Sequence, residues 1–342
     1  MAGAPRARPQ TIADVAAKAG VSLATVSRVM NGNASVDAGL AERVRTAADE
    51  LGYSASPLAR SLASGRTSTI AVLVPDLENP TFQGVLRGLN RAAVRDGYHV
   101  MVADTTESLR EERVLAVETR RRCDGLVLVA PRMPDDELRS LLGQLEPVVL
   151  VNRDVGVADV PVVAADYRGA LAELLALVHS LGHRSLVFLA GAPQSASNAQ
   201  RLEAVRAFLD EHADASVSVL PCGVTFADGY AAVDRVRESR ATAVLAFNDL
   251  VAMGLLSGLH AQGVRVPEDL SVVGFDDIPF ARYLLPPLTT AAVPVVELGE
   301  QAWRRMHDLL EHRPLGEPVV LRPRVEQRGS AAAVPAGREA VG

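Results

Sequence analysis

Short apolar runs alternate with longer amphipathic segments along most of the chain, from residue 68 onward. The runs form two series, with TIAVLVPD, HVMVADT, GLVLVA and VVLVNR in the first and SLVFLAG, VSVLPCG, AVLAFN and LSVVGFD in the second. Each run is typical of a buried strand, and the segments between them repeat apolar residues at helical spacing. Strands that alternate with helices form parallel sheets, so the pattern predicts an α/β body of two parallel-sheet lobes.

The first sixty residues carry short helical patterns instead. The segment TIADVAAKAG predicts a helix that Thr11 and Asp14 open as a capping-box pair and that Gly20 ends. The segment LATVSRVMN predicts a second helix, with Ser22 as its N-cap. Two short helices joined by a tight glycine-containing turn are the helix-turn-helix pattern. A third helix, predicted from about residue 38 to residue 51, has the apolar spacing to cover the first two.

The second predicted helix has two distinct faces. At about 100° per residue, Val26 and Val29 share one face. The opposite face carries Leu23, Ala24, Ser27, Arg28 and Asn31. A narrow core stripe and an outer face with one arginine suit the major groove of DNA. The alternative is an ordinary three-helix bundle that does not bind DNA.

A further short helix is predicted between the head and the body. Ser56 as N-cap and Pro57 at the first helical position start it, and Gly65 ends it after about two turns. Isolated helices shorter than ~12–15 residues are marginal in water. We therefore expect this segment to act as a hinge that folds only when something packs against it.

Four polar residues follow predicted strands of the body or open a helix beside them, namely Asn152, Arg201, Asn248 and Asp276. Ligands of parallel sheets bind at the carboxyl ends of the strands, so we expect these side chains to line a cleft. A carboxylate, a guanidinium and two amides suit a polyhydroxylated ligand such as a sugar. For Arg201 and Asp276 the alternative is a structural ion pair or a cap.

Charge is distributed unevenly along the chain. The net charge is −6, but residues 1–66 carry eight basic and five acidic side chains, which leaves −9 for the remainder. A basic head on an acidic body predicts that the head alone meets a polyanion.

Composition and motifs exclude several classes of protein. Hydrophobic residues make up 48% and charged residues 22%, which is typical of a soluble globular chain. No apolar run approaches the ~20 residues of a membrane span. The N-terminal MAGAPRARPQ has no apolar stretch behind it, so we expect no secretory signal, a cytoplasmic protein, and free thiols at Cys123 and Cys222.

The chain lacks the sequence signatures of common enzymes. GxGxxG, P-loop, HExxH and GxSxG motifs are absent, the seven histidines are scattered, and the cysteines have no metal-type spacing. We therefore predict no catalytic residue, no metal site, no cofactor and no enzyme activity. A periplasmic sugar-binding protein remains an alternative for the body, although the predicted DNA-reading head argues against it.

The chain resembles the LacI family of bacterial transcription regulators, of the LacI/GalR type, over nearly its whole length. The matching stretches are TIADVAAKAGVSLATVSRVMNG, ELGY, PLARSL, LENPTF, SVVGFDDIPFARYLLPPLTT and VEQRGS. The resemblance implies a helix-turn-helix head on a periplasmic-binding-protein-like body. It also implies a repressor that binds a palindromic DNA operator as a homodimer and is switched by a small-molecule effector, which we expect to be a sugar or sugar derivative.

The resemblance assigns a role to particular residues of the head. DNA contacts are implied for Thr11, Ser22, Leu23, Ala24, Thr25, Ser27, Arg28 and Asn31. Arg28 suits a guanine edge and Ala24 a thymine methyl, whereas the serines and Asn31 suit phosphates. In the hinge helix, Leu62 takes the position of a minor-groove wedge at a central CpG step, flanked by Ala59 and Arg60.

The resemblance also implies the effector site and the domain boundaries. Effector contacts are implied for Asn79, Thr81, Phe82, Asn152, Arg201, Asn248 and Asp276. The predicted organisation is a flexible N-terminus (1–10), a helix-turn-helix domain (11–55), a hinge helix and linker (56–67), an effector-binding and dimerisation domain (68–330) and a disordered tail (331–342). Lobe 1 is expected over about 68–165 and 293–319, and lobe 2 over about 166–292 and 320–330.

Overall fold

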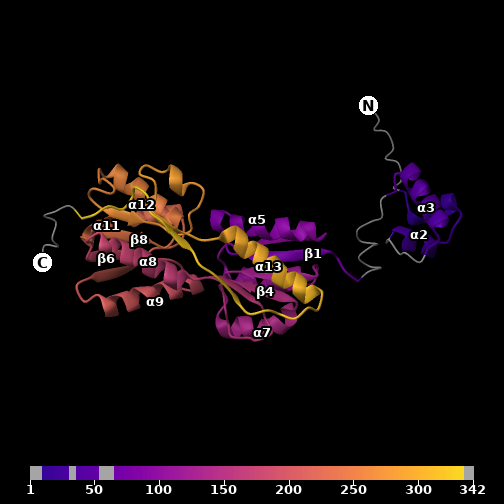
Figure 1. Ribbon diagram of the computed structural model, residues 1–342, viewed down its shortest axis with the longest axis horizontal. Coiled ribbons are helices and arrows are strands. Elements are labelled where there is room, and N and C mark those ends of the chain that lie inside the picture. The colour runs from indigo at the N-terminus through magenta and orange to yellow at the C-terminus, as the bar shows by residue number, and fades with distance from the viewer. Residues whose placement is uncertain (1–9, 31–35, 54–64, 335–342) are drawn as a thin grey trace, which may run out of the picture. The chain divides into compact units, whose positions relative to one another are not determined.

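The computed structural model describes residues 10–30, 36–53 and 65–334. The chain forms two compact units that divide between Ser68 and Thr69 (Figure 1). Within the described ranges, none of the helices is both long and apolar enough to cross a membrane.

The described part of the first unit folds into the three predicted helices, α1 (Ile12–Ala19), α2 (Leu23–Met30) and α3 (Ala38–Leu51). The capping box of Thr11 and Asp14 is present at the start of α1, and Gly20 ends that helix with a φ of 64°. Fully buried Val15, Val26 and Val44 form the centre of its core. The helix-turn-helix prediction is confirmed, and its predicted last residue, Asn31, lies outside the described residues.

Lobe 1 contains a six-stranded parallel sheet with the strand order β11-β5-β4-β3-β1-β2. Its strands are β1 (Thr69–Val74), β2 (His99–Asp104), β3 (Gly125–Val129), β4 (Val148–Val151), β5 (Val162–Ala165) and β11 (Val319–Leu321). Its helices are α5 (Pro80–Arg95), α6 (Leu109–Arg120), α7 (Asp135–Leu145) and α13 (Val295–Leu310). The side chains of β1 alternate between two cores: Ile70 and Val72 pack with α5 and α13, whereas Ala71 and Leu73 pack with α6 and α7.

Helices α5 and α13 lie side by side over one face of this sheet (Figure 1). Two glycines permit their close approach. A Cβ atom on Gly88 would lie 2.0 Å from the carbonyl oxygen of Val296, and one on Gly299 would lie 2.0 Å from that of Val85. The two helix backbones are therefore in direct contact, which allows no side chain larger than hydrogen at these positions.

Lobe 2 contains a four-stranded parallel sheet with the order β7-β6-β8-β9. Its strands are β6 (Ser185–Ala190), β7 (Ser216–Pro221), β8 (Ala243–Ala246) and β9 (Ser271–Val273). Its helices are α8 (Tyr167–Ser180), α9 (Ala196–Glu211), α10 (Phe226–Ala231), α11 (Val233–Glu238), α12 (Asp249–Ala261) and the short 3-10 helix η1 (Ala281–Tyr283). The predicted body of two parallel-sheet lobes is confirmed.

The chain passes between the lobes at three places. It leaves the first sheet between β5 and α8 and returns through β10 (Thr290–Ala292), which leads to α13. It leaves again after β11 through β12 (Arg324–Glu326), which pairs antiparallel with β10. These paired segments lie between the lobes in Figure 1.

The expectation of a disordered tail from residue 331 is wrong for its first four residues. Ala331 is buried, the carbonyl oxygen of Ala332 lies 3.0 Å from Nε2 of His183, and the amide of Val334 donates to the carbonyl of Leu181. This segment is held to lobe 2 by hydrogen bonds of its backbone, which its small apolar side chains do not reveal. Residues 335–342 lie outside the described residues.

Candidate functional site

Helix α2 presents the face that the pattern predicts for DNA. Val26 and Val29 are buried, whereas Leu23, Ala24 and Arg28 are exposed. Leu23 is 54% exposed, which leaves an apolar side chain available for contact on this face. The Nε atom of Arg28 donates to the carbonyl of Ala24 at 3.3 Å, so the guanidinium extends along the outer surface of the helix.

The hydroxyl groups around α1 and α2 take part in helix capping. Ser22 accepts a hydrogen bond from the amide of Thr25 at 3.2 Å, and their hydroxyl oxygens lie 2.9 Å apart. Thr11 donates to the carboxylate of Asp14 at 2.7 Å. The structure therefore places Thr11, Ser22 and Thr25 at helix N-termini, where amide groups and the helix dipole favour a phosphate.

Several basic side chains of the head form ion pairs or hydrogen bonds with other residues of the head. Lys18 forms an ion pair with Glu50 at 2.7 Å, and Arg45 with Glu42 at 3.5 Å. Arg43 donates to the carbonyl oxygen of Ala19 at the C-terminal end of α1. The roles predicted for Asn31, Ala59, Arg60 and Leu62 stay predictions, because these residues lie outside the described residues.

Arg201, on α9, is the central residue of the candidate site in the body. Its side chain is almost completely buried, with 1% exposed. Its guanidinium carbon lies 3.9 Å from the ring centroid of Phe275, 4.5 Å from that of Phe247 and 4.6 Å from that of Tyr167. Its Nε and Nη1 atoms are buried and have no hydrogen-bond partner among the described residues. Burial lowers the pKa of Arg201 to about 10, although the nearby Asp276 opposes the shift. Buried donors without acceptors are costly, so this guanidinium is suited to a ligand that brings acceptor oxygens.

Asp276 lies three residues after the end of β9, and its carboxylate interacts with the charge of Arg201. Burial raises the pKa of its carboxyl to about 6, against the opposing effects of Arg201 and of the hydrogen bond from Thr81. The hydroxyl of Thr81, on α5 of lobe 1, donates to Oδ2 of Asp276 at 2.8 Å and so connects the lobes. Asp276 has a φ of 112°, and its amide is held by the carbonyl of Ala291. Such strain in a buried polar residue is a feature of functional sites.

The other predicted residues on α5 have different partners. Asn79 is the N-cap of the helix and accepts from the amide of Thr81 at 3.0 Å. Phe82 is buried in the core of lobe 1. Of the three residues implied on this helix, Thr81 is the one whose side chain reaches lobe 2 in the structure.

The two predicted asparagines of the strand ends are bound within the fold. Asn152 accepts from the amide of Ala165 at 2.9 Å and donates to the hydroxyl of Tyr167 at 2.9 Å. Asn248 caps α12 through the amide of Val251 and donates to the carbonyl of Val224, each at 2.8 Å. Asn152 therefore orients the ring of Tyr167, which lies beside Arg201. Asn248 directly follows Phe247, whose ring also lies beside Arg201.

Sequence reasoning missed the aromatic residues that surround Arg201. Phe247 directly follows β8, Phe275 stands two residues after the end of β9, and Tyr167 opens α8. The rings of Tyr167 and Phe275 are stacked, with centroids 5.6 Å apart. An aromatic residue at each of several strand ends was the available signal, but the same residues are equally typical of a core.

Asp249 was also missed. It is fully buried, accepts from the hydroxyl of Thr290 at 2.7 Å and from the amide of Ile278 at 2.8 Å. Burial, together with the charge of Asp276, raises its pKa well above the usual range. Asp249 thereby ties the loop that carries Asp276 to α12 and β10.

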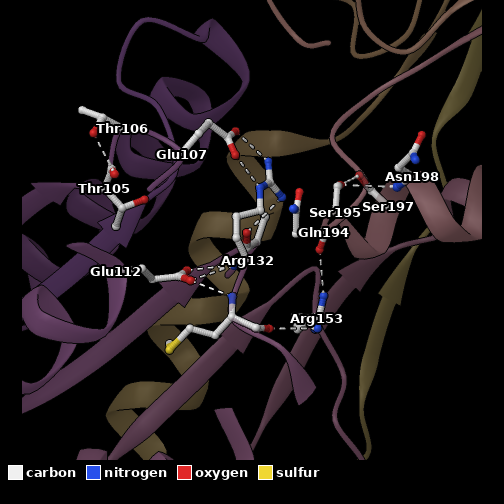
Figure 2. A network of polar contacts seen from close by, with 12 residues as sticks. Thr105, Thr106, Glu107, Glu112, Arg132, Arg153, Gln194, Ser195, Ser197 and Asn198 are labelled. Carbon is white, nitrogen blue, oxygen red and sulfur yellow. Dashed lines mark hydrogen bonds and ion pairs between the residues drawn. The ribbon is translucent and has the colours of Figure 1, made fainter. Parts of the chain in front are cut away.

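A polar network adjoins this region and also connects the lobes (Figure 2). Arg132, which is 6% exposed, binds both carboxylate oxygens of Glu107, at 2.7 and 2.9 Å. Arg153 donates to Asp135 of lobe 1 at 2.6 Å and to the carbonyl of Gln194 in lobe 2 at 3.2 Å. Neither arginine was singled out in the sequence, because nothing local distinguishes them from surface arginines.

Two family models match the chain. The model described as bacterial regulatory proteins, lacI family, matches residues 11–56, and that of a periplasmic binding protein-like domain matches residues 175–331. The HTH-type transcriptional repressor CytR of Escherichia coli (strain K12) is 31% identical over 314 residues, which are 90% of this chain and 91% of that protein.

Two solved structures are similar in fold. A LacI family transcriptional regulator from Enterococcus faecium with bound ribose has a TM-score of 0.69 and 29% identity, over 78% of this chain and 99% of that chain. The lac repressor dimer bound to operator and the anti-inducer ONPF has a TM-score of 0.84 and 24% identity, over 95% of this chain and 100% of that chain. Both comparisons agree with the observed fold.

Proposed function

Because the chain belongs to the LacI family and is a DNA-binding transcriptional regulator, we propose that it represses transcription as a homodimer on a palindromic operator and is released or recruited by a neutral, polyhydroxylated effector. One observation carries the effector half of the proposal, namely the buried Arg201 guanidinium whose Nε and Nη1 have no acceptor among the described residues. The family membership, and not the absence of catalytic motifs, establishes that the chain is no enzyme.

The DNA half rests on the exposed face of α2. Arg28 suits the two acceptors of a guanine edge, and Leu23 and Ala24 suit thymine methyl groups. A two-fold symmetric dimer reads the same half-site twice, in opposite directions, so the operator is an inverted repeat. The predicted wedge at Leu62 adds a central CpG step, which deforms easily.

The charges at the effector site favour a neutral ligand. The cation of Arg201 is balanced by the nearby carboxylate of Asp276, while Arg132 is paired with Glu107. A guanidinium that donates and a carboxylate that accepts match the paired hydroxyl groups of a sugar. The similar regulator from Enterococcus faecium binds ribose, which is such a ligand.

The position of the site suggests how binding is communicated. Thr81 belongs to lobe 1, whereas Arg201 and Asp276 belong to lobe 2. A ligand that contacts both lobes favours the arrangement in which they are close, and so changes the equilibrium of the body. In a dimer, that change alters whether the two hinge segments can pair and fold.

The operator prediction is tested by fluorescence anisotropy with the full-length protein. We expect a salt-sensitive preference for inverted repeats centred on CpG over random duplex. Arg28→Ala is expected to remove ~1–3 kcal/mol of discrimination at one base pair of each half-site. Arg45→Ala, an exposed arginine of α3, is the matched control and keeps the preference. Equal losses on every sequence would show that Arg28 touches phosphate alone, and no preference in any ligand state would refute the proposal.

The effector prediction is tested by a thermal-shift screen with neutral sugars, nucleosides and sugar phosphates. A ligand at 100 times its Kd stabilises the folded protein by ~2.7 kcal/mol. Arg201→Gln is expected to fold and to lose this stabilisation, because it removes the guanidinium donors. Arg206→Ala, exposed on the same helix, keeps it. A ligand response that survives in Arg201→Gln would contradict the assignment of the site.

A further inference from the structure

Helices α8 and α9 end beside one another on lobe 2 and bring three possible metal ligands together. His179 lies in the last turn of α8, His212 is the C-cap of α9, and Asp214 follows in the loop to β7. His179 is twelve residues beyond Tyr167, or roughly 18 Å along the helix axis, so the cluster is distinct from the effector site.

The ligand atoms of the three residues are close enough for one cation. One ligand atom from each residue lies within 4.8 Å of the other two. Among the described residues, these three are the histidine, cysteine and acidic residues found at a spacing that could hold a metal ion. His179 Nε2 and Asp214 Oδ1 are 3.3 Å apart. Tetrahedral zinc with bonds of ~2.0–2.1 Å places its ligand atoms about 3.3–3.5 Å apart, so small side-chain rotations complete the geometry.

The surroundings orient the two imidazoles. Their ring centroids are 4.3 Å apart, and the ring of Phe208 contacts both, at 5.6 Å from His179 and 4.5 Å from His212. Phe208 precedes His212 by one helical turn on α9, which limits the directions that both rings can take.

Charges of both signs surround the cluster. Both helices end here, and the C-terminal ends of helices carry partial negative charge. Arg184 is the opposing charge: its Nε lies 2.6 Å from Oδ2 of Asp214, and its Nη1 donates to the carbonyl of His179. Because Arg184 holds the other carboxylate oxygen, Oδ1 stays directed at His179, as an outer partner does for a metal-binding carboxylate.

We propose that His179, His212 and Asp214 form a binding site for a divalent transition-metal ion, with Zn²⁺ as the best fit to two imidazoles and one carboxylate. Water completes the coordination at this partly exposed position. A bound ion joins the ends of α8 and α9 to the loop that leads to β7, and so stabilises lobe 2. The seven histidines gave no spacing signal because the ligands come from two helices and a loop.

The test is isothermal titration of the metal-free full-length protein with zinc chloride near neutral pH. We expect one zinc ion per chain and a higher thermal midpoint with zinc. X-ray absorption is expected to show nitrogen and oxygen ligands at ~2.0–2.1 Å.

Variants separate a built site from general histidine binding. His179→Ala and His212→Ala are expected to abolish zinc binding, while His260→Ala, an exposed histidine of the same lobe, is expected to keep it. His212→Gln serves as a second variant, and circular dichroism without zinc checks that each variant folds. No zinc binding by the wild type, or binding that persists in folded His212→Gln and His179→Ala, would overturn the proposal.

Discussion

Individual residues at the proposed effector site are held in energetically costly states. Arg201 is stacked among three aromatic rings, yet its Nε and Nη1 donors are not satisfied by the described residues. Asp276 combines burial with a φ of 112°. Backbone hydrogen bonds with Ala291 and Val293 hold Asp276 in its strained conformation, and the proposed ligand would supply acceptors for Arg201.

The raised pKa of Asp276 predicts that effector binding depends on pH. Its carboxyl has a pKa of about 6, so the side chain loses its charge as the pH falls below that value. If ligand hydroxyls donate to the carboxylate, the effector Kd is expected to rise about tenfold for each pH unit below 6, as measured by isothermal titration. Asp276→Asn is expected to bind more weakly and with no such dependence. A flat wild-type profile would exclude this role for the carboxylate.

The raised pKa of Asp276 also makes the stability of the unliganded protein depend on pH. The folded state holds a proton on Asp276 between the usual Asp pKa and about 6, whereas the unfolded chain has released it. The contribution of this group to the free energy of unfolding is therefore greatest at low pH and is lost as the pH rises through about 6.

At the scale of elements, local sequence rules and close contacts decide which helices form and how near they lie. Asp37 caps α3 through the amide of Leu40, as its position before the helix predicts. The contact between α5 and α13 instead depends on glycines at which no cap or turn is required. A glycine inside a helix is unfavourable by itself, so its presence indicates close packing against a neighbour.

Two glycine substitutions separate these effects. Gly88→Ala is expected to destabilise lobe 1 by ~1–3 kcal/mol, because its new Cβ would lie 2.0 Å from the carbonyl oxygen of Val296. Gly143→Ala in α7 is the matched control. Nothing lies within 4 Å of its Cβ position, so it is expected to stabilise the helix by up to ~1 kcal/mol. Urea unfolding measures both, and a neutral Gly88→Ala would mean that the two helices separate readily.

At the scale of the body, few polar contacts join the lobes beside the crossing segments. Three of those among the described residues have side-chain donors on lobe 1: the hydroxyl of Thr81 to Asp276, the guanidinium of Arg153 to the carbonyl of Gln194, and the amide of Asn152 to the hydroxyl of Tyr167. The first lies within the proposed effector site and the second in the network of Figure 2. Closure of the lobes thus depends on a small number of bonds that a ligand can reinforce.

Removing the second contact is expected to weaken effector binding indirectly. Arg153→Ala loses a bond between the lobes of roughly 1 kcal/mol, which corresponds to about a fivefold higher effector Kd. Arg139→Ala is the control, because Arg139 donates to Asp136 and to the carbonyl of Val155 within lobe 1. Isothermal titration measures both variants. Equal effects in the two, or none in Arg153→Ala, would show that the contact does not contribute to closure.

Much of the architecture could be predicted because it depends on short-range order. The spacing of valines in α2, the capping box at Thr11 and the alternation of apolar runs with helices are readable within a few residues of the chain. The proximity of Arg201 and Asp276 was also predictable, since each stands where a parallel-sheet topology gathers side chains, while their role as effector ligands stays a prediction.

What the linear pattern determined by itself was the set of elements, the head and the two lobes, because helix and strand periods are properties of neighbouring residues. The tertiary structure alone decided which distant polar groups are partners: it bound Asn152 to Ala165 and Asn248 to Val224, left donors of Arg201 without an acceptor among the described residues, and gathered His179, His212 and Asp214 from three segments. Those outcomes depend on contacts between residues far apart in the chain, and no local period records which distant groups will meet.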